Sequence, residues 1–98
     1  MLTSKQRAYL KSLAMTENPV VLLGKESLTG ANTMNVEEAL AARELVKIGV
    51  LKNCADDPRV IAEMVAERTH SEVVQVIGKK IVLYRPGKGK NKKIELPK

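Results

Sequence analysis

The chain has 98 residues, of which 44% are hydrophobic and 29% charged, so it can form one domain with a substantial core but not two. A single cysteine excludes an internal disulfide, and the absence of an N-terminal apolar signal segment predicts a cytoplasmic protein. No apolar run approaches the length of a membrane span, and the formal net charge of +6 favours an anionic partner.

The first expected elements are a helix and a buried strand. Thr3 or Ser4 can cap the helix, whose apolar residues recur at helical spacing and are Tyr9, Leu10, Leu13 and Ala14. Pro19 ends this region, because the residue before a proline avoids helical geometry. The four apolar residues at positions 20–23 then predict a buried strand.

A second helix and a second strand are expected next. The helix begins between Thr29 and Asn35, since both residues can cap a helix and Asn35 with Glu38 resembles a capping box. Its inner face is apolar, whereas two adjacent glutamates mark its outer face. The alternation of apolar and polar residues over 44–51 then predicts a strand.

The C-terminal half predicts a third helix and a hairpin. Asp57-Pro58 is a strong helix start, because a capping carboxylate precedes a proline at the first helical position, and the helix extends to about residue 69. Two runs rich in β-branched residues, 72–77 and 81–85, flank a Gly-Lys-Lys turn and predict an antiparallel hairpin.

The resulting order is α-β-α-β-α-β-β, which predicts an α/β domain with a four-stranded mixed sheet. Two strand-to-strand passages through a helix require at least one parallel pair, and the terminal hairpin adds an antiparallel pair. We expect a single domain over residues 1–86 and a basic tail over residues 87–98.

Aromatic residues and positive charge are both unevenly used. Two tyrosines are the only aromatic residues, so the core must be aliphatic, and base stacking would be a minor mode of contact with RNA. Residues 79–98 hold eight Lys or Arg and one acid, whereas the first 78 residues hold nine bases and ten acids. This basic end can bind an anionic partner or serve only solubility.

The stretch VVLLGKESLT, residues 20–29, joins the first strand to the second helix. A loop that leads from Gly24 and Lys25 into a helix offers free N–H groups, the positive end of a helix dipole and an ammonium group. These are the groups that bind an anionic backbone, so the loop points toward nucleic acid. Gly24 also has a purely structural interpretation, since glycine permits a tight turn out of the strand.

Residue types that support catalysis are scarce. His70, the only histidine, falls at the end of a helix, where the helix dipole favours it. Cys54, the only cysteine, lies beside Asp56 and Asp57, which oppose a thiolate. No spacing suits zinc or calcium, and the glycine loop lacks the Gly-Lys-Ser/Thr ending of a nucleotide-binding loop. We expect that the protein is not an enzyme and binds no metal, cofactor or small-molecule substrate. The alternative of an RNA-modifying enzyme would need His70 and Cys54 in one cleft.

A family resemblance is carried by four segments, which read LTSKQRAYLKSLA, PVVLLGKESLT, EEALAARELVKI and VVQVIGKKIVLYRPGK and cover nearly the whole chain in order. Together they resemble the CRM domain family, named for chloroplast RNA splicing and ribosome maturation, and above all its stand-alone bacterial YhbY-like RNA-binding proteins. The resemblance implies the element order derived above and a fold similar to the C-terminal domain of translation initiation factor 3. It also implies binding to structured RNA, which in bacteria means ribosomal RNA in precursors of the large subunit.

The resemblance further implies that RNA is approached through a G-x-x-G loop and by cations of the first helix. On this sequence the candidates are Gly24, Lys25, Glu26 and Ser27 in the loop, and Lys5, Arg7 and Lys11 in the helix. The family's second loop glycine is Ser27 here. A serine costs about 1 kcal/mol or more where φ is positive, but adds a hydroxyl donor where φ is helical. The negative charge of Glu26 would repel a phosphate backbone bound at the loop unless its side chain turns outward.

Further candidates lie later in the chain. Lys47 alternates with apolar neighbours and either faces an open side of the sheet or is an ordinary exposed strand residue. Arg85 and Lys88 follow the last strand and either extend the basic surface or solubilise the tail. Tyr84 is more typical of a half-buried strand residue than of a stacking platform. We expect a monomer, and the alternative function is a protein-interaction module whose basic tail docks an acidic partner.

Overall fold

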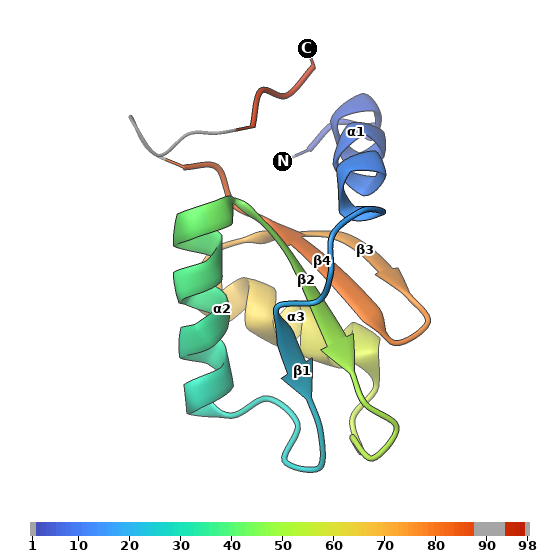
Figure 1. Cartoon of the computed structure of the whole chain (residues 1–98), viewed down its shortest axis with the longest axis vertical. Coiled ribbons are helices and arrows are strands. Elements are labelled where there is room, and N and C mark those ends of the chain that lie inside the picture. Colours follow the sequence, from blue (N-terminus) through green and yellow to red (C-terminus); the bar gives the residue numbers. More distant parts are fainter. Residues whose placement is uncertain (1, 88–93, 98) are drawn as a thin grey trace.

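The computed structural model describes residues 2–87 and 94–97 of the chain. Its elements follow the predicted order and are α1 (Ser4–Ala14), β1 (Val21–Leu23), α2 (Gly30–Arg43), β2 (Leu45–Val50), α3 (Pro58–Thr69), β3 (Glu72–Ile77) and β4 (Lys80–Tyr84). The strands form one sheet in the order β1-β2-β4-β3 (Figure 1). β1 pairs with β2 in parallel, and β4 pairs antiparallel with both β2 and β3. The predicted α/β fold with a four-stranded mixed sheet is therefore confirmed.

Local capping explains where the helices begin. Thr3 forms a capping box with Gln6, in which each side chain bonds the other residue's backbone N–H at 3.1 Å. Thr29 caps α2, so the helix starts at the early end of the predicted interval and Asn35 lies inside it. Asp57 caps α3 by accepting from the backbone N–H of Arg59 at 2.8 Å, as the Asp-Pro pair predicted.

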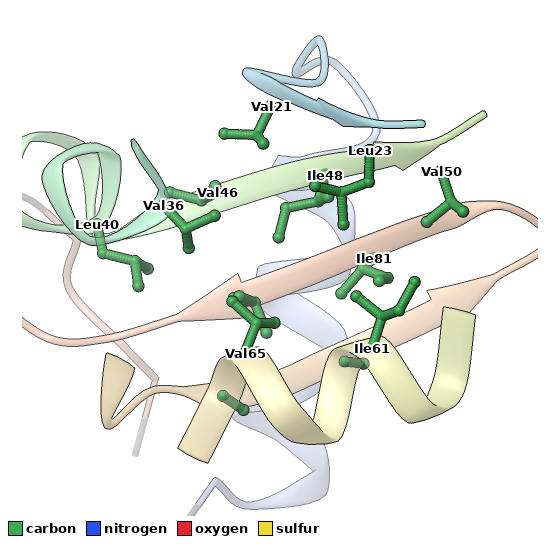
Figure 2. Packing of buried hydrophobic residues seen from close by; sticks show 13 residues of the cluster. Val21, Leu23, Val36, Leu40, Val46, Ile48, Val50, Ile61, Val65 and Ile81 are labelled. Carbon is green, nitrogen blue, oxygen red and sulfur yellow. The ribbon is translucent and has the colours of Figure 1, made fainter. Parts of the chain in front are cut away.

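The sheet has a helical layer on each face. On one face α2 and α3 bury the larger cluster of aliphatic side chains, which Figure 2 shows converging from β1, β2, β4 and the two helices. On the other face α1 places Leu10 and Ala14 on a smaller cluster. That smaller cluster is completed by residues from β2, β3 and β4, which are Leu45, Val74, Val82 and Tyr84. The core is aliphatic apart from Tyr84, in keeping with the composition.

A buried carboxylate holds part of the C-terminal segment against the domain. Glu44, at the C-terminal cap of α2, has no exposed surface. Its Oε2 accepts from the backbone N–H of Gly87 at 2.7 Å, and its Oε1 accepts from that of Ile94 at 2.9 Å. Ile94 and Leu96 pack against the α1 cluster. The division between residues 1–86 and 87–98 stays a prediction, but residues 94–97 contact the body of the domain.

Candidate nucleic-acid interface

The loop after β1 is a tight turn with its charged residues outside. The backbone N–H of Ser27 donates to the carbonyl of Gly24 at 2.9 Å, and the side chains of Lys25 and Glu26 between them are exposed. Thr29 then caps α2. The expected sequence of strand, loop and helix start is present, with the lysine at the tip of the loop. The carboxylate of Glu26 is exposed beside it.

Ser27 adopts the conformation that the glycine of the family pattern would favour. Its φ is +58°, in the left-handed region, and its side chain is 92% buried, with 8% exposed. Within the described residues its Oγ has no hydrogen-bond partner. The serine therefore bears the steric cost of a positive φ. Its hydroxyl is buried, so it is not available to a phosphate at the surface.

The φ of Gly24 is not positive, and a Cβ there would meet its neighbours at ordinary contact distances. A Cβ at Gly24 would lie 3.4 Å from Oδ1 of Asn53 and 3.5 Å from Cδ1 of Leu51. The backbone N–H of Leu51 also donates to the carbonyl of Leu23 at 2.8 Å. The loop after β2 therefore lies beside the loop after β1, at the bottom of Figure 1.

This neighbour adds two exposed residues, Lys52 and Asn53, that the sequence reasoning did not select. The signal that could have found them is the parallel pairing of β1 and β2. The loops that follow two adjacent parallel strands lie at the same edge of a sheet, where α/β proteins gather binding groups.

The three cations of α1 differ in how they are used. Lys5 and Lys11 are exposed, and within the described residues neither has a hydrogen-bond or ion-pair partner. The guanidinium of Arg7 instead donates to the carbonyl oxygens of Val73 and Val74, the latter at 3.1 Å. These carbonyls lie where β3 shifts its register against β4, so Arg7 fastens α1 to an irregular strand edge.

Two cations outside α1 also have internal partners. Nζ of Lys47 donates to the carbonyls of Ala14 at 3.3 Å and Glu17 at 3.4 Å, so it neutralises the negative end of α1. Nη1 of Arg85 lies 2.6 Å from Oε2 of Glu37 and 2.9 Å from the carbonyl of Thr69. The guanidinium of Arg85 therefore lies on the α2 and α3 side of the sheet, and Lys88 lies outside the described residues.

The features that could have supported stacking or catalysis are placed apart. Tyr84 is only 2% exposed, so its ring is not a platform for a base. Burial and the nearby carboxylate of Glu44 raise the pKa of Tyr84 above its usual value.

Cys54 precedes α3 and His70 caps its far end, which separates them by the length of a twelve-residue helix, about 18 Å. The described residues contain no metal-binding cluster of His, Cys, Asp and Glu.

Charge is distributed differently on the two faces of the sheet. α1 carries three cations and no acid, whereas α2 and α3 together carry four acids and three cations. A polyanion therefore meets more favourable charge on the α1 face.

Among the described residues, no helix is long and apolar enough to span a membrane.

The family model for the CRS1/YhbY (CRM) domain matches residues 2–85, which is almost all of the described body of the protein. The chain belongs to the CRM domain family. It is 43% identical over 97 residues to the probable RNA-binding protein YqeI of Bacillus subtilis, a match that covers 99% of this chain and all of that protein. It is 38% identical to an RNA-binding protein of Haemophilus influenzae, over 99% of this chain and 96% of that protein.

A solved structure agrees with this assignment. The solution structure of a Staphylococcus aureus protein that has been proposed to bind RNA superimposes with a TM-score of 0.82 at 45% identity. The match covers 99% of this chain and all of the other. The CRM fold expected from the four sequence segments is therefore present, and each of these three relatives is described as an established, probable or proposed RNA-binding protein.

Proposed function

We propose that this CRM domain is a non-catalytic, cytoplasmic RNA-binding protein that binds ribosomal RNA in precursors of the large subunit as an assembly factor. The observation that carries the proposal is the exposure of three lysines without internal partners in the described residues. Lys25 lies at the tip of the G-x-x-G-like loop, and Lys5 and Lys11 lie on α1. Ammonium groups without internal partners are free to bind phosphates, and their contacts would release counterions from RNA.

The candidate residues divide into three groups with different duties. Lys5, Lys11 and Lys25 would contact the RNA backbone, together with Lys52 and Asn53 beside the loop. Gly24 and Ser27 shape the loop itself. Arg7, Lys47 and Arg85 hold elements of the fold together through their backbone and carboxylate partners. We propose that these three act on RNA mainly by positioning the α1 face and the last strand.

Crosslinking in living cells tests which RNA is bound. The protein is irradiated in place on its RNA, and the contacted nucleotides are mapped. We expect crosslinks concentrated at a few positions of the large-subunit ribosomal RNA and enriched in precursor particles. Crosslinks spread over cellular RNAs in proportion to their abundance would reject a role in ribosome assembly, while leaving general RNA binding in place.

The alternative function rests on the eight cations of the last twenty residues, which could dock an acidic protein. Deleting residues 87–98 would not test this cleanly, because it removes the packing of Ile94 and Leu96 and the partners of Glu44. Replacing the lysines at 88, 90, 92 and 93 with glutamine keeps those contacts. Loss of a protein partner with RNA binding unchanged would favour the alternative.

A further inference from the structure

One row of residues crosses all four strands on the α1 side of the sheet. Leu22 of β1 pairs with Gly49 of β2, Gly49 pairs with Lys80 of β4, and Lys80 pairs with Ile77 of β3. Directly paired residues point to the same face of a sheet. The row spans three strand spacings, or about 14 Å.

α1 leaves this row uncovered. The helix packs on the opposite end of the same face, over Leu45, Val74 and Tyr84. Leu22 and Ile77 are each 58% exposed, and Lys80 is exposed between them. A Cβ at Gly49 would lie 2.8 Å from Cδ2 of Leu22 and 3.5 Å from Cβ of Pro19, so these two side chains cover the glycine and the exposed part of the row is Leu22, Lys80 and Ile77.

A groove of about 520 Å³ runs between this open end of the sheet and α1. Its lining contains three lysines and no acidic residue. The larger side chains of the lining include Lys11, Met15, Lys47, Gln75, Ile77 and Lys80. Lys47 is held by the end of α1, which leaves Lys11 and Lys80 as cations without partners in the described residues, one on each wall.

The groove also separates the two candidate RNA contacts. Figure 1 places α1 at the top of the view and the loop after β1 at the bottom, and the connection from α1 to β1 runs over the sheet between them. An RNA that contacts both Lys25 and Lys11 must therefore pass along this face beside that connection. Two apolar side chains on this face are exposed, Met15 by 82% and Ile77 by 58%, and neither can bind a phosphate.

We propose that the groove binds an unpaired segment of the RNA, with phosphates on Lys11 and Lys80 and bases on Met15 and Ile77. An A-form duplex presents phosphates and 2′-hydroxyls at its surface and keeps its base faces stacked, so it would leave these apolar side chains exposed. An unpaired strand can turn its bases onto them. Gln75 supplies an amide for the edge of a base.

The proposal rests on the proposed function, since it names the form of RNA bound at the same surface. The lysines alone would accept either RNA or an acidic peptide. The exposed apolar side chains favour RNA, because acidic side chains would pair with the lysines but leave the apolar side chains uncovered. A peptide is therefore treated as an outcome of the test.

The experiment compares a hairpin RNA that carries a single-stranded uridine tail with the same hairpin made blunt-ended. The wild-type protein should bind the tailed RNA about tenfold more tightly, because the tail covers exposed apolar side chains and adds phosphate contacts to the lysines. The double variant Lys80→Ala, Ile77→Ser should lose this preference while binding the blunt hairpin as the wild type does. The double variant Arg68→Ala, Val60→Ser changes an exposed cation and an exposed apolar residue on α3, and should keep the preference.

The possible contrary results are distinct. Equal binding of both RNAs by the wild type, or an unchanged preference in the groove variant, would overturn the groove proposal alone. No binding of either RNA would overturn the proposed function as well. If the groove variant lost binding to a poly-glutamate peptide but kept its preference for tailed RNA, the occupant would be an acidic protein segment. Far-ultraviolet circular dichroism and the unfolding midpoint confirm that each variant is folded.

Discussion

The guanidinium of Arg7 in α1 donates a hydrogen bond to the carbonyl oxygen of Val74 in β3, 3.1 Å away. The same guanidinium contacts the carbonyl of Val73, so two backbone acceptors at the register shift of β3 share one cation. Such acceptors have fewer partners within the ladder than those of a regular strand. A residue selected as an RNA contact therefore has a structural duty.

Arg7→Ala should lower the free energy of unfolding by about 2 kcal/mol, because it removes charge-assisted bonds to two partly buried carbonyls. Lys5→Ala, which removes an exposed cation two residues away on the same helix, should change it by less than about 0.5 kcal/mol. Urea unfolding measures both. Equal stability of the two variants would mean that the Arg7 contacts contribute nothing.

Ser27→Gly should stabilise the protein by about 1 kcal/mol or more. The backbone at Ser27 has a φ of +58°, which glycine adopts without the steric cost that serine bears. Glycine also removes a buried hydroxyl that has no partner in the described residues. Ser27→Ala separates the two effects, since it removes the hydroxyl and keeps the steric cost. If glycine gave no more stability than alanine, the backbone at this position would not be strained.

Tyr84 should make stability fall at alkaline pH. Burial, and then the carboxylate of Glu44, raise the pKa of Tyr84, so the folded state holds the phenol proton more tightly than the unfolded state does. This contribution is complete below the unfolded pKa of about 10 and is lost as the pH rises toward the folded value, by up to about 1.4 kcal/mol per pH unit.

Urea unfolding at increasing pH measures this decline. Tyr84→Phe should remove it and should also relieve a buried hydroxyl without a partner in the described residues. Tyr9→Phe, at the tyrosine that is 38% exposed, should retain it. A decline that is the same in wild type and in Tyr84→Phe would assign the alkaline loss to other groups.

Glu44→Gln should lower the free energy of unfolding by about 1–3 kcal/mol. The carboxylate accepts from the backbone N–H groups of Gly87 and Ile94, whereas an amide can accept with one atom only and turns a donor toward the other N–H. Glu95→Gln makes the same change at an exposed carboxylate that follows Ile94 but accepts neither of these bonds, and it is the control. Limited proteolysis near residue 94 should be faster in Glu44→Gln and unchanged in Glu95→Gln.

Much of the fold follows from local signals that need no tertiary information. Asp57-Pro58 fixed the start of α3, and the Gly-Lys turn fixed the hairpin, because each acts within a few residues. Glu44 shows where such signals stop. It was expected to begin a strand, but it ends α2 with a φ of +66°, a position where glycine is usual. Its buried carboxylate bonds residues 43 and 50 positions later, and no local pattern specifies such a partner.

The candidate interface was predictable to a similar depth. The loop and its lysine followed from the order of strand, glycine and helix cap. Lys52 and Asn53 required the parallel register of β1 and β2, and Lys80 required the insertion of β4 between β2 and β3. The internal duties of Arg7 and Lys47 required the position of α1 on the sheet, which depends on side chains far apart in sequence.

The most direct test of the account is the salt-dependent affinity of charge-reversal variants for a large-subunit ribosomal RNA fragment. Lys11→Glu and Lys25→Glu lie on the proposed interface, whereas Arg59→Glu and Arg68→Glu make the same change of charge on exposed positions of α3. Each lysine variant should lose about tenfold in affinity, and the magnitude of its slope of log affinity against log salt should fall by about one. The arginine variants should stay within about twofold of wild type. Equal losses from both pairs, or an affinity that does not change with salt, would contradict RNA binding through the loop and the α1 face.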